Sequence, residues 1–192
     1  MAGILTGLLV VIIQFLLSWN EYRYIENFKR LGIKEIRKDR DKREFYENLI
    51  KNSHKCIDVM GVTASRFMEH FADAESGRPE TRVLLDAMNR KIKVRILVPK
   101  SEFLDRKEEK DNASKSKRNF ENVKTSYPEL FEYRYFQHVP AHGIVVVDDE
   151  CIIGPIFPQL RSKDTPCIHM YNHSAYAQKY LDYFEDEWKK AT

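Results

Sequence analysis

The chain has 192 residues, 43% apolar and 12% aromatic, with only 7 glycines and 7 prolines, so its composition excludes a disordered or fibrous protein. Its 32 basic and 29 acidic residues leave a net charge of +3, which by itself gives no argument for a nucleic-acid partner. The three cysteines, Cys56, Cys151 and Cys167, lack close spacing and favour a reducing compartment.

Residues 1–20 contain no charged side chain, and the run GILTGLLVVIIQFLLSW is polar only at Thr6, Gln14 and Ser18. Eighteen helical residues span about 27 Å, enough for a thin hydrocarbon core. No basic residue precedes the run and no small-x-small site follows it, which argues against a cleaved secretory signal. We therefore predict a transmembrane helix over residues 1–20. A buried helix of the following domain is the alternative.

Residues 21–43 are predicted to form a charged, helical juxtamembrane stalk. Trp19, Tyr22 and Tyr24 resemble an interfacial aromatic belt, and nine basic residues stand against five acidic ones over residues 20–43. The positive-inside rule then predicts a single-pass protein with its N-terminus outside and its domain in the cytoplasm. A solvated charged face is the alternative to contact with anionic lipid headgroups. The side chains predicted to contact the headgroups are Lys29, Arg30, Lys34 and Arg37.

Residues 44–192 alternate between helical and extended patterns and are predicted to form one domain. The almost wholly polar residues 100–118 are predicted to be an exposed loop or frayed helix. Continuous apolar strands such as IVVV indicate a sheet covered on both faces, so the predicted fold is α/β, with a mixed sheet flanked by helices. The expected helices cover residues 45–50, 67–71, 83–88, 120–127 and 174–190, and the expected strands residues 56–62, 93–99, 130–136, 143–149, 151–157 and 167–171.

The order of these elements, together with the stretch HGIVVVDD at residues 142–149, resembles the phospholipase D superfamily over roughly residues 40–191. It is most similar to the single-motif members, small nucleases and phosphodiesterases in which two chains pair to build one active site. Their motif is HxKxxxxD. The resemblance implies that His142 is the nucleophile and that Asp149 orients its imidazole.

The chain departs from the motif at the lysine and at the polar turn that follows. Ile144 occupies the lysine position, and Pro155 and Phe157 stand where the family has a serine and an asparagine after the turn glycine, Gly154. Loss of one preorganised group that stabilises the transition state costs about 3–4 kcal/mol. The sequence therefore predicts a domain without catalysis.

Other groups are candidates for a phosphate site. Arg161 and Lys163 are candidates to take the place of the missing lysine in space, and His138 is either a second imidazole of the site or a solvated loop histidine. Cys167, His169 and His173 lack the paired spacing of a structural zinc site. The sequence therefore predicts neither a metal nor a cofactor.

Two functions follow as hypotheses. The first is a membrane-anchored, cytoplasmic, phospholipase-D-like protein without catalysis, acting as a dimerising sensor or membrane effector that binds a phosphate, nucleotide or lipid headgroup. The second is an active phosphodiesterase, a nuclease or phospholipid hydrolase, with His142 in a dimeric site. Membrane lipids, a second copy of the chain and a phosphate-containing ligand are the expected partners, and a protein held by a purely structural tether remains a third alternative.

Overall fold

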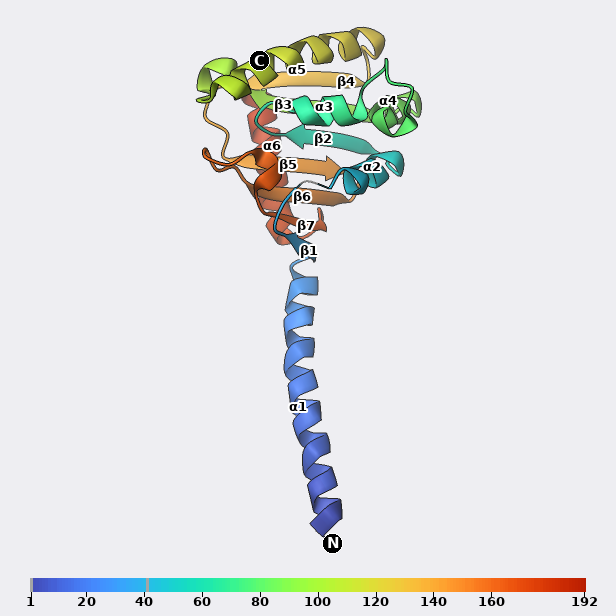
Figure 1. Ribbon diagram of the computed structural model, residues 1–192, viewed down its shortest axis with the longest axis vertical. Coiled ribbons are helices and arrows are strands. Elements are labelled where there is room, and N and C mark those ends of the chain that lie inside the picture. The colour runs from blue at the N-terminus through green and yellow to red at the C-terminus, as the bar shows by residue number, and fades with distance from the viewer. Residues whose placement is uncertain (1, 41) are drawn as a thin grey trace.

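The computed structural model describes residues 2–40 and 42–192 as a mixed seven-stranded sheet with helices on both faces and one long helix leading away from it (Figure 1). The strand order is β1-β7-β6-β5-β2-β3-β4. Strands β2, β3 and β4 are parallel, and the remaining neighbours pair antiparallel. The predicted α/β class and mixed sheet are confirmed. The strands are β1 (Ile33–Arg37), β2 (Cys56–Met60), β3 (Lys93–Pro99), β4 (Phe131–Phe136), β5 (His142–Val147), β6 (Glu150–Pro155) and β7 (Cys167–Tyr171).

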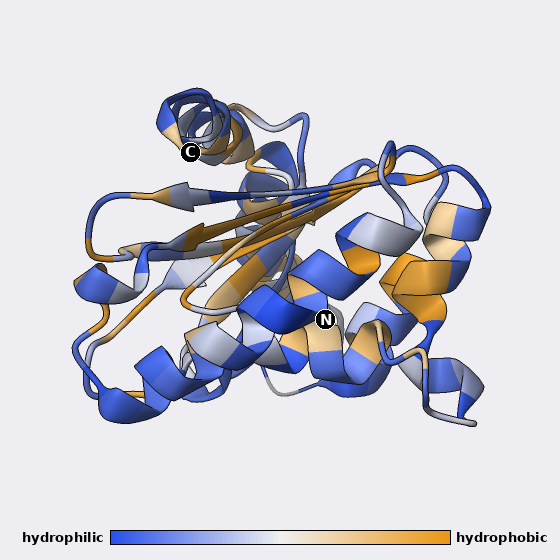
Figure 2. Cartoon of the chain, turned by 90° about the horizontal axis from the view of Figure 1, so that it is seen from above, coloured by the Kyte–Doolittle hydropathy of each residue, from blue (hydrophilic) through white to orange (hydrophobic). Residues whose placement is uncertain are grey.

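Helices form two layers over the sheet. In Figure 2 the apolar strands lie between them. One face is covered by α2, α3, α4 and α5, which share a buried core with the inward side chains of β2, β3 and β4. On the other face, the described part of the chain places α6 over Ile144, Val146 and Met60. The helices are α1 (Ala2–Arg30), α2 (Arg43–Lys51), α3 (Ser65–Phe71), α4 (Val83–Asn89), α5 (Lys107–Ser126) and α6 (Ala175–Lys190), with short 3₁₀ turns at Pro79–Thr81, Ser101–Phe103 and Ser162–Asp164.

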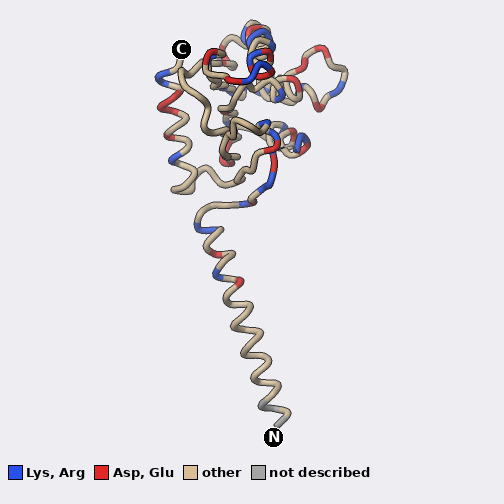
Figure 3. The backbone as a smooth tube through the Cα atoms, turned by 60° about the vertical axis from the view of Figure 1, so that its left-hand side comes forward, with Lys and Arg blue, Asp and Glu red and all other residues tan. Residues whose placement is uncertain are grey.

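Helix α1 is a single unbroken helix, and Figure 3 shows that its charged residues are confined to the part nearest the domain. Large apolar side chains between Leu8 and Leu17 are exposed, up to 63% at Leu17. Among the residues that the structure describes, no helix combines the length and the apolar character needed to cross a membrane. Met1 and Asp41, which the predicted anchor and stalk include, lie outside the described residues.

The prediction of a helical stalk over residues 21–43 is wrong beyond Arg30. Residues 33–37 form strand β1, which pairs antiparallel with β7 at the edge of the sheet. Gly32 causes the change, because it adopts a positive φ of 71° that ends the helix. Any side chain at Gly32 would also collide with Ser174, whose hydroxyl accepts a hydrogen bond from Ala177 N–H at the start of α6. The chain therefore enters the sheet earlier than the sequence predicts.

Of the two alternatives predicted for residues 100–118, an exposed loop or a frayed helix, the loop is wrong for residues 107–118. Residues 107–126 form one continuous helix, α5, and no glycine or proline occurs between residues 100 and 127 to interrupt it. Its N-terminal half carries almost no apolar residue, so the sequence shows no amphipathic pattern there. The C-terminal half is anchored by the fully buried Phe120, whose ring lies 5.2 Å from that of Tyr133.

Helix α6 is attached to the sheet by polar contacts as well as by its apolar face. Arg95 of β3 makes a two-pronged pair with Asp58 of β2, with both nitrogen–oxygen distances at 2.7 Å. The same guanidinium reaches Glu185 of α6 at 2.6 Å and lies 5.0 Å from the ring centre of Phe184. Hydrogen bonding to Asp58 raises the pKa of Arg95 above its ordinary value. Arg95 therefore joins two strands and the covering helix.

Candidate functional site

His142 begins β5 and points toward α6. Because side chains alternate along a strand, His142 and Ile144 share one face of the sheet, and Gly143 and Val145 share the other. The imidazole packs edge-on against Tyr180 and Tyr183 of α6, at ring distances of 5.4 and 5.8 Å. Ile144 is fully buried in the core beneath α6. The position of the family lysine is thus a core position here.

Asp149 lies at the other end of β5 and does not meet His142. A six-residue strand is about 17 Å long, so the two side chains are separated by its whole length. The Asp149 carboxylate pairs instead with the ammonium of Lys55 at 2.7 Å, and this hydrogen bond holds the pKa of Asp149 below its ordinary value. The structure therefore does not bring together the histidine and the acid that the motif would pair.

The other predicted imidazole, His138, is engaged on the same face as His142. Its Nε2 lies 2.7 Å from a carboxylate oxygen of Glu187 in α6, and its Nδ1 lies 3.0 Å from the carbonyl of Val139. These contacts help to fix α6. His138 does not line the cavity described next.

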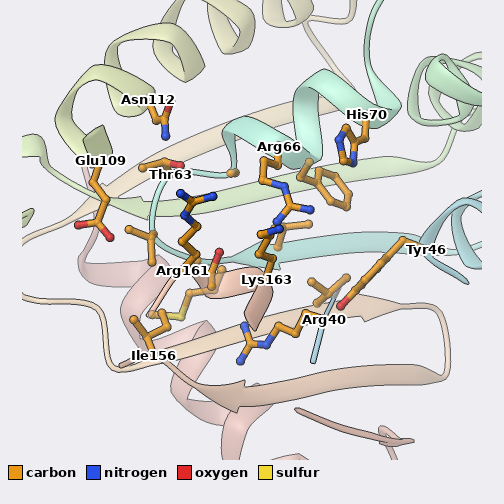
Figure 4. A pocket seen from close by; sticks show the side chains of 18 of the residues that line it. Arg40, Tyr46, Thr63, Arg66, His70, Glu109, Asn112, Ile156, Arg161 and Lys163 are labelled. Carbon is orange, nitrogen blue, oxygen red and sulfur yellow. The ribbon is translucent and has the colours of Figure 1, made fainter. Parts of the chain in front are cut away.

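A cavity of about 410 Å³ lies on the opposite face of the sheet, between the strands and helices α2, α3 and α5 (Figure 4). Six of the described residues that line it are cationic and two are carboxylates, an excess of four positive charges. The cations come from four separate segments, so folding and not sequence proximity brings them together. They are Arg40, Arg43, Arg66, Arg106, Arg161 and Lys163, and the carboxylates are Glu108 and Glu109.

The Arg40 guanidinium lies against a floor made by two glycines. Gly143 of β5 and Gly154 of β6 are directly paired across the strands, and a methyl group at either position would overlap the Arg40 guanidinium. The Arg40 side chain donates from Nη2 to the carbonyl of Pro155 at 3.3 Å. The backbone N–H of Arg40 donates to the carbonyl of Lys163 at 2.8 Å. The absence of side chains at the two glycines is what allows a guanidinium to occupy the face of the sheet.

Buried donors in this cavity lack acceptors. Arg40 Nε and Arg43 Nε and Nη2 are inaccessible to solvent and find no hydrogen-bond partner among the residues that the structure describes. Burial lowers the pKa of Arg40 from its ordinary value, but a guanidinium stays protonated in proteins. A donor that is buried without an acceptor is costly. These atoms are closed to water and therefore also to an anion, so a ligand in the cavity would meet the two side chains at their other atoms.

Two predicted phosphate-binding residues, Arg161 and Lys163, do line this cavity. They lie there with Arg40, on the opposite face of the sheet from His142. Sequence reasoning missed Arg40 and Arg43, which it assigned to the stalk. The available signal was the placement of Gly143 and Gly154 at matching positions of two neighbouring strands, where apolar residues would otherwise be expected.

The basic residues predicted to contact lipid headgroups fall into two groups. Lys29 and Arg30 are exposed in the last turn of α1. Lys34 pairs with Glu150 at 2.6 Å, and Arg37 pairs with Glu35 and stacks 3.6 Å from the ring centre of Phe45. The charged groups of Lys34 and Arg37 therefore make contacts within the domain.

Cys167 and His169 make contacts within the domain. His169 is nearly buried, and its Nε2 lies 2.6 Å from Glu150. Cys167 is buried beside β1. Within residues 2–40 and 42–192, no three histidine, cysteine or carboxylate side chains are grouped so that they could hold a metal ion.

No protein-family model matches the sequence, and neither does any curated protein. Solved structures do match. The archaeal chromatin protein TrmBL2, described as showing a novel mode of DNA binding, is 12% identical with a TM-score of 0.56, and the match covers 93% of this chain. It covers 64% of TrmBL2, so the chain spans less than two thirds of that protein.

Two bacterial proteins are further matches. Nuc from Salmonella typhimurium, a phospholipase D family member, is 15% identical with a TM-score of 0.49, over 78% of this chain and 88% of Nuc. NucT from Helicobacter pylori is 10% identical with a TM-score of 0.49, over 78% of this chain and 88% of NucT. At these identities the similarity is one of fold. Nuc, which is described as a phospholipase D family member, is one of the solved structures that this chain matches.

Proposed function

We propose that this chain binds a phosphate-bearing ligand in its cationic cavity and does not cleave it, and that α1 holds the domain at a membrane. The observation that carries the proposal is the net positive lining of the cavity, where six described cationic residues stand against two carboxylates. Guanidinium forks match phosphate oxygens in geometry and in charge. An anion in the cavity would lower the electrostatic cost of holding these cations close together.

Several features favour binding over catalysis. The histidine of the motif, His142, is not part of the described cavity lining, because it points to the opposite face and packs against tyrosines. Phosphoryl transfer through His142 would also need a cation beside it, and the position that supplies one in the family holds the buried Ile144. The cationic side chains that line the cavity lie instead on the other face of the sheet.

Membrane attachment rests on α1. Its large apolar side chains between Leu8 and Leu17 lie on all sides of the helix, as in a segment surrounded by an apolar medium. Trp19 and Tyr22 follow, with ring centres 6.2 Å apart, at the place expected for an interface. The homodimer and the orientation of the chain across the membrane stay predictions.

Ligand binding can be measured by titrating the full-length chain, in detergent micelles at constant ionic strength, with inorganic phosphate in a calorimeter. We expect saturable binding that weakens about tenfold in Arg43→Gln, because one charge-assisted hydrogen bond is worth about 1.5–3 kcal/mol. Arg118→Gln makes the same change of charge on the exposed side of α5, outside the cavity, and should leave the affinity unchanged.

Absence of saturable phosphate binding, or an equal loss in Arg118→Gln, would contradict the binding proposal. The non-catalytic part is tested separately on the same preparation with a generic phosphodiester such as bis-p-nitrophenyl phosphate. We expect no turnover. Turnover that disappears in His142→Ala would instead establish the phosphodiesterase hypothesis.

Membrane attachment is tested with Val10→Arg, in the middle of the apolar half of α1. A charge at the centre of a membrane-inserted helix costs about 2.5–3.5 kcal/mol, so the variant should shift markedly from the membrane to the soluble fraction after cell lysis. Lys29→Arg keeps the charge at the other end of α1 and serves as the control. An unchanged membrane fraction in Val10→Arg would show that this segment does not hold the chain there.

A further inference from the structure

The cavity is much larger than a phosphate group and has an aromatic end. Its volume of about 410 Å³ falls in the range typical of sites for small organic ligands. Beside the cations, Tyr46 of α2 and Phe67 and His70 of α3 line one side, and Figure 4 shows Tyr46 and His70 on the same side of the cavity. A ligand that fills the space therefore extends from the cations toward these rings.

The aromatic residues of α3 are held in place by their own helix. Phe67 and Phe71 are four residues apart and meet edge-to-face at 5.3 Å, and His70 meets Phe71 at 5.9 Å. Phe71 is buried and fixes the other two. Phe67 and His70 themselves are only partly buried, so they keep accessible surface facing the cavity.

The Tyr46 hydroxyl adds no negative charge next to the cations. Burial raises the pKa of Tyr46 to about 12, so the phenol stays protonated at neutral pH. Its ring remains a flat apolar surface beside Arg40 and Arg43. The cavity thus combines a positively charged floor with a neutral aromatic wall.

We infer that the ligand is a nucleoside phosphate, whose phosphate group lies against Arg40 and Arg43 and whose base stacks on the aromatic wall of Tyr46, Phe67 and His70. This inference rests on the proposed function. Aromatic side chains stack on any base because every base has a π face, so the wall accounts for a base but does not select one. A sugar phosphate or a glycerophosphate headgroup has no flat face to cover these rings.

The inference is tested by titrating the full-length chain in micelles with four ligands: adenosine 5′-monophosphate, ribose 5-phosphate, glycerol 3-phosphate and inorganic phosphate. We expect the nucleotide to bind at least tenfold more tightly than ribose 5-phosphate, which differs from it only by the base. Glycerol 3-phosphate represents a lipid headgroup and should bind no more tightly than ribose 5-phosphate.

Phe67→Leu removes the ring but keeps an apolar side chain of similar size. It should bring the nucleotide to within about threefold of ribose 5-phosphate and leave the affinity for inorganic phosphate unchanged. Phe45→Leu is the matched control, because Phe45 lies on α2 outside the cavity, against Arg37 and His169. It should preserve the preference for the nucleotide.

The outcomes separate this inference from the proposed function. Equal binding of the nucleotide and ribose 5-phosphate, or a preference that survives in Phe67→Leu, overturns the nucleoside assignment while phosphate binding stands. Tighter binding of glycerol 3-phosphate than of the nucleotide overturns it in favour of a lipid headgroup. Failure of all four ligands to bind defeats the proposed function itself.

Discussion

Replacing Gly143 by alanine should abolish most phosphate binding while leaving the protein folded. The added methyl group would occupy the space of the Arg40 guanidinium, which is the mobile end of a long side chain and can swing away. The Arg40 guanidinium would then leave its position against the sheet, and its two Nη groups would no longer be placed to bind a phosphate. We expect the affinity for inorganic phosphate, measured by calorimetry, to fall about a hundredfold.

A double-mutant cycle shows whether the effect passes through Arg40. Arg40→Gln should weaken binding by a similar factor, and the Gly143→Ala/Arg40→Gln double variant should be no worse than either single variant. Gly77→Ala is the control, because a side chain there would meet nothing within 4 Å. Undiminished binding by Gly143→Ala would show that the floor does not position an anion-binding group.

Replacing Asp58 by alanine should give the largest loss of stability among the polar substitutions. The Asp58 side chain is only 9% exposed and accepts both prongs of Arg95. Breaking a buried pair from one side typically costs about 3–5 kcal/mol, because the remaining charge is left uncompensated. Arg95 keeps Glu185 and some contact with water, so we expect about 3 kcal/mol in denaturant unfolding, or a Tm lower by roughly 6–12 °C.

The partner on the helix provides the comparison. Glu185 is 45% exposed, and its removal in Glu185→Ala should cost less than about 1 kcal/mol, as for other surface pairs. A joint Asp58→Leu/Arg95→Met replacement removes both charges and should recover most of the lost stability. Equal destabilisation by Asp58→Ala and Glu185→Ala would show that the contact between the strands is not the important one.

Most strands and helices of the domain follow from the sequence because their patterns are local. The apolar runs at residues 56–60, 93–99 and 142–147 have the length and β-branched content of buried strands, and the structure places strands there. Strand β1 was missed, and the N-terminal half of α5 could not be distinguished from a loop, for opposite reasons. The sequence IKEIR is short and charged and becomes a strand only by pairing with β7, whereas half of α5 overhangs the core and so shows no apolar face.

The candidate site was harder to predict because it depends on contacts distant in sequence. The motif around His142 drew attention to one face of β5, and Ile144 and Asp149 could be judged from spacing alone. The cavity lies on the other face and combines Arg40, from the segment before α2, with side chains beyond β6. Only the register of β5 against β6, which aligns two glycines, reveals where the Arg40 guanidinium lies.

The continuity of α1 has a geometric consequence for the whole chain. Twenty-nine helical residues extend about 44 Å, and the twelve from Trp19 to Arg30 account for about 18 Å of that length. Because no break occurs before Gly32, those twelve residues act as a rigid spacer. The edge of the sheet therefore stays at a fixed distance from the apolar part of α1, whatever surrounds that part. A change in the angle between α1 and the domain would have to occur at residues 31–32.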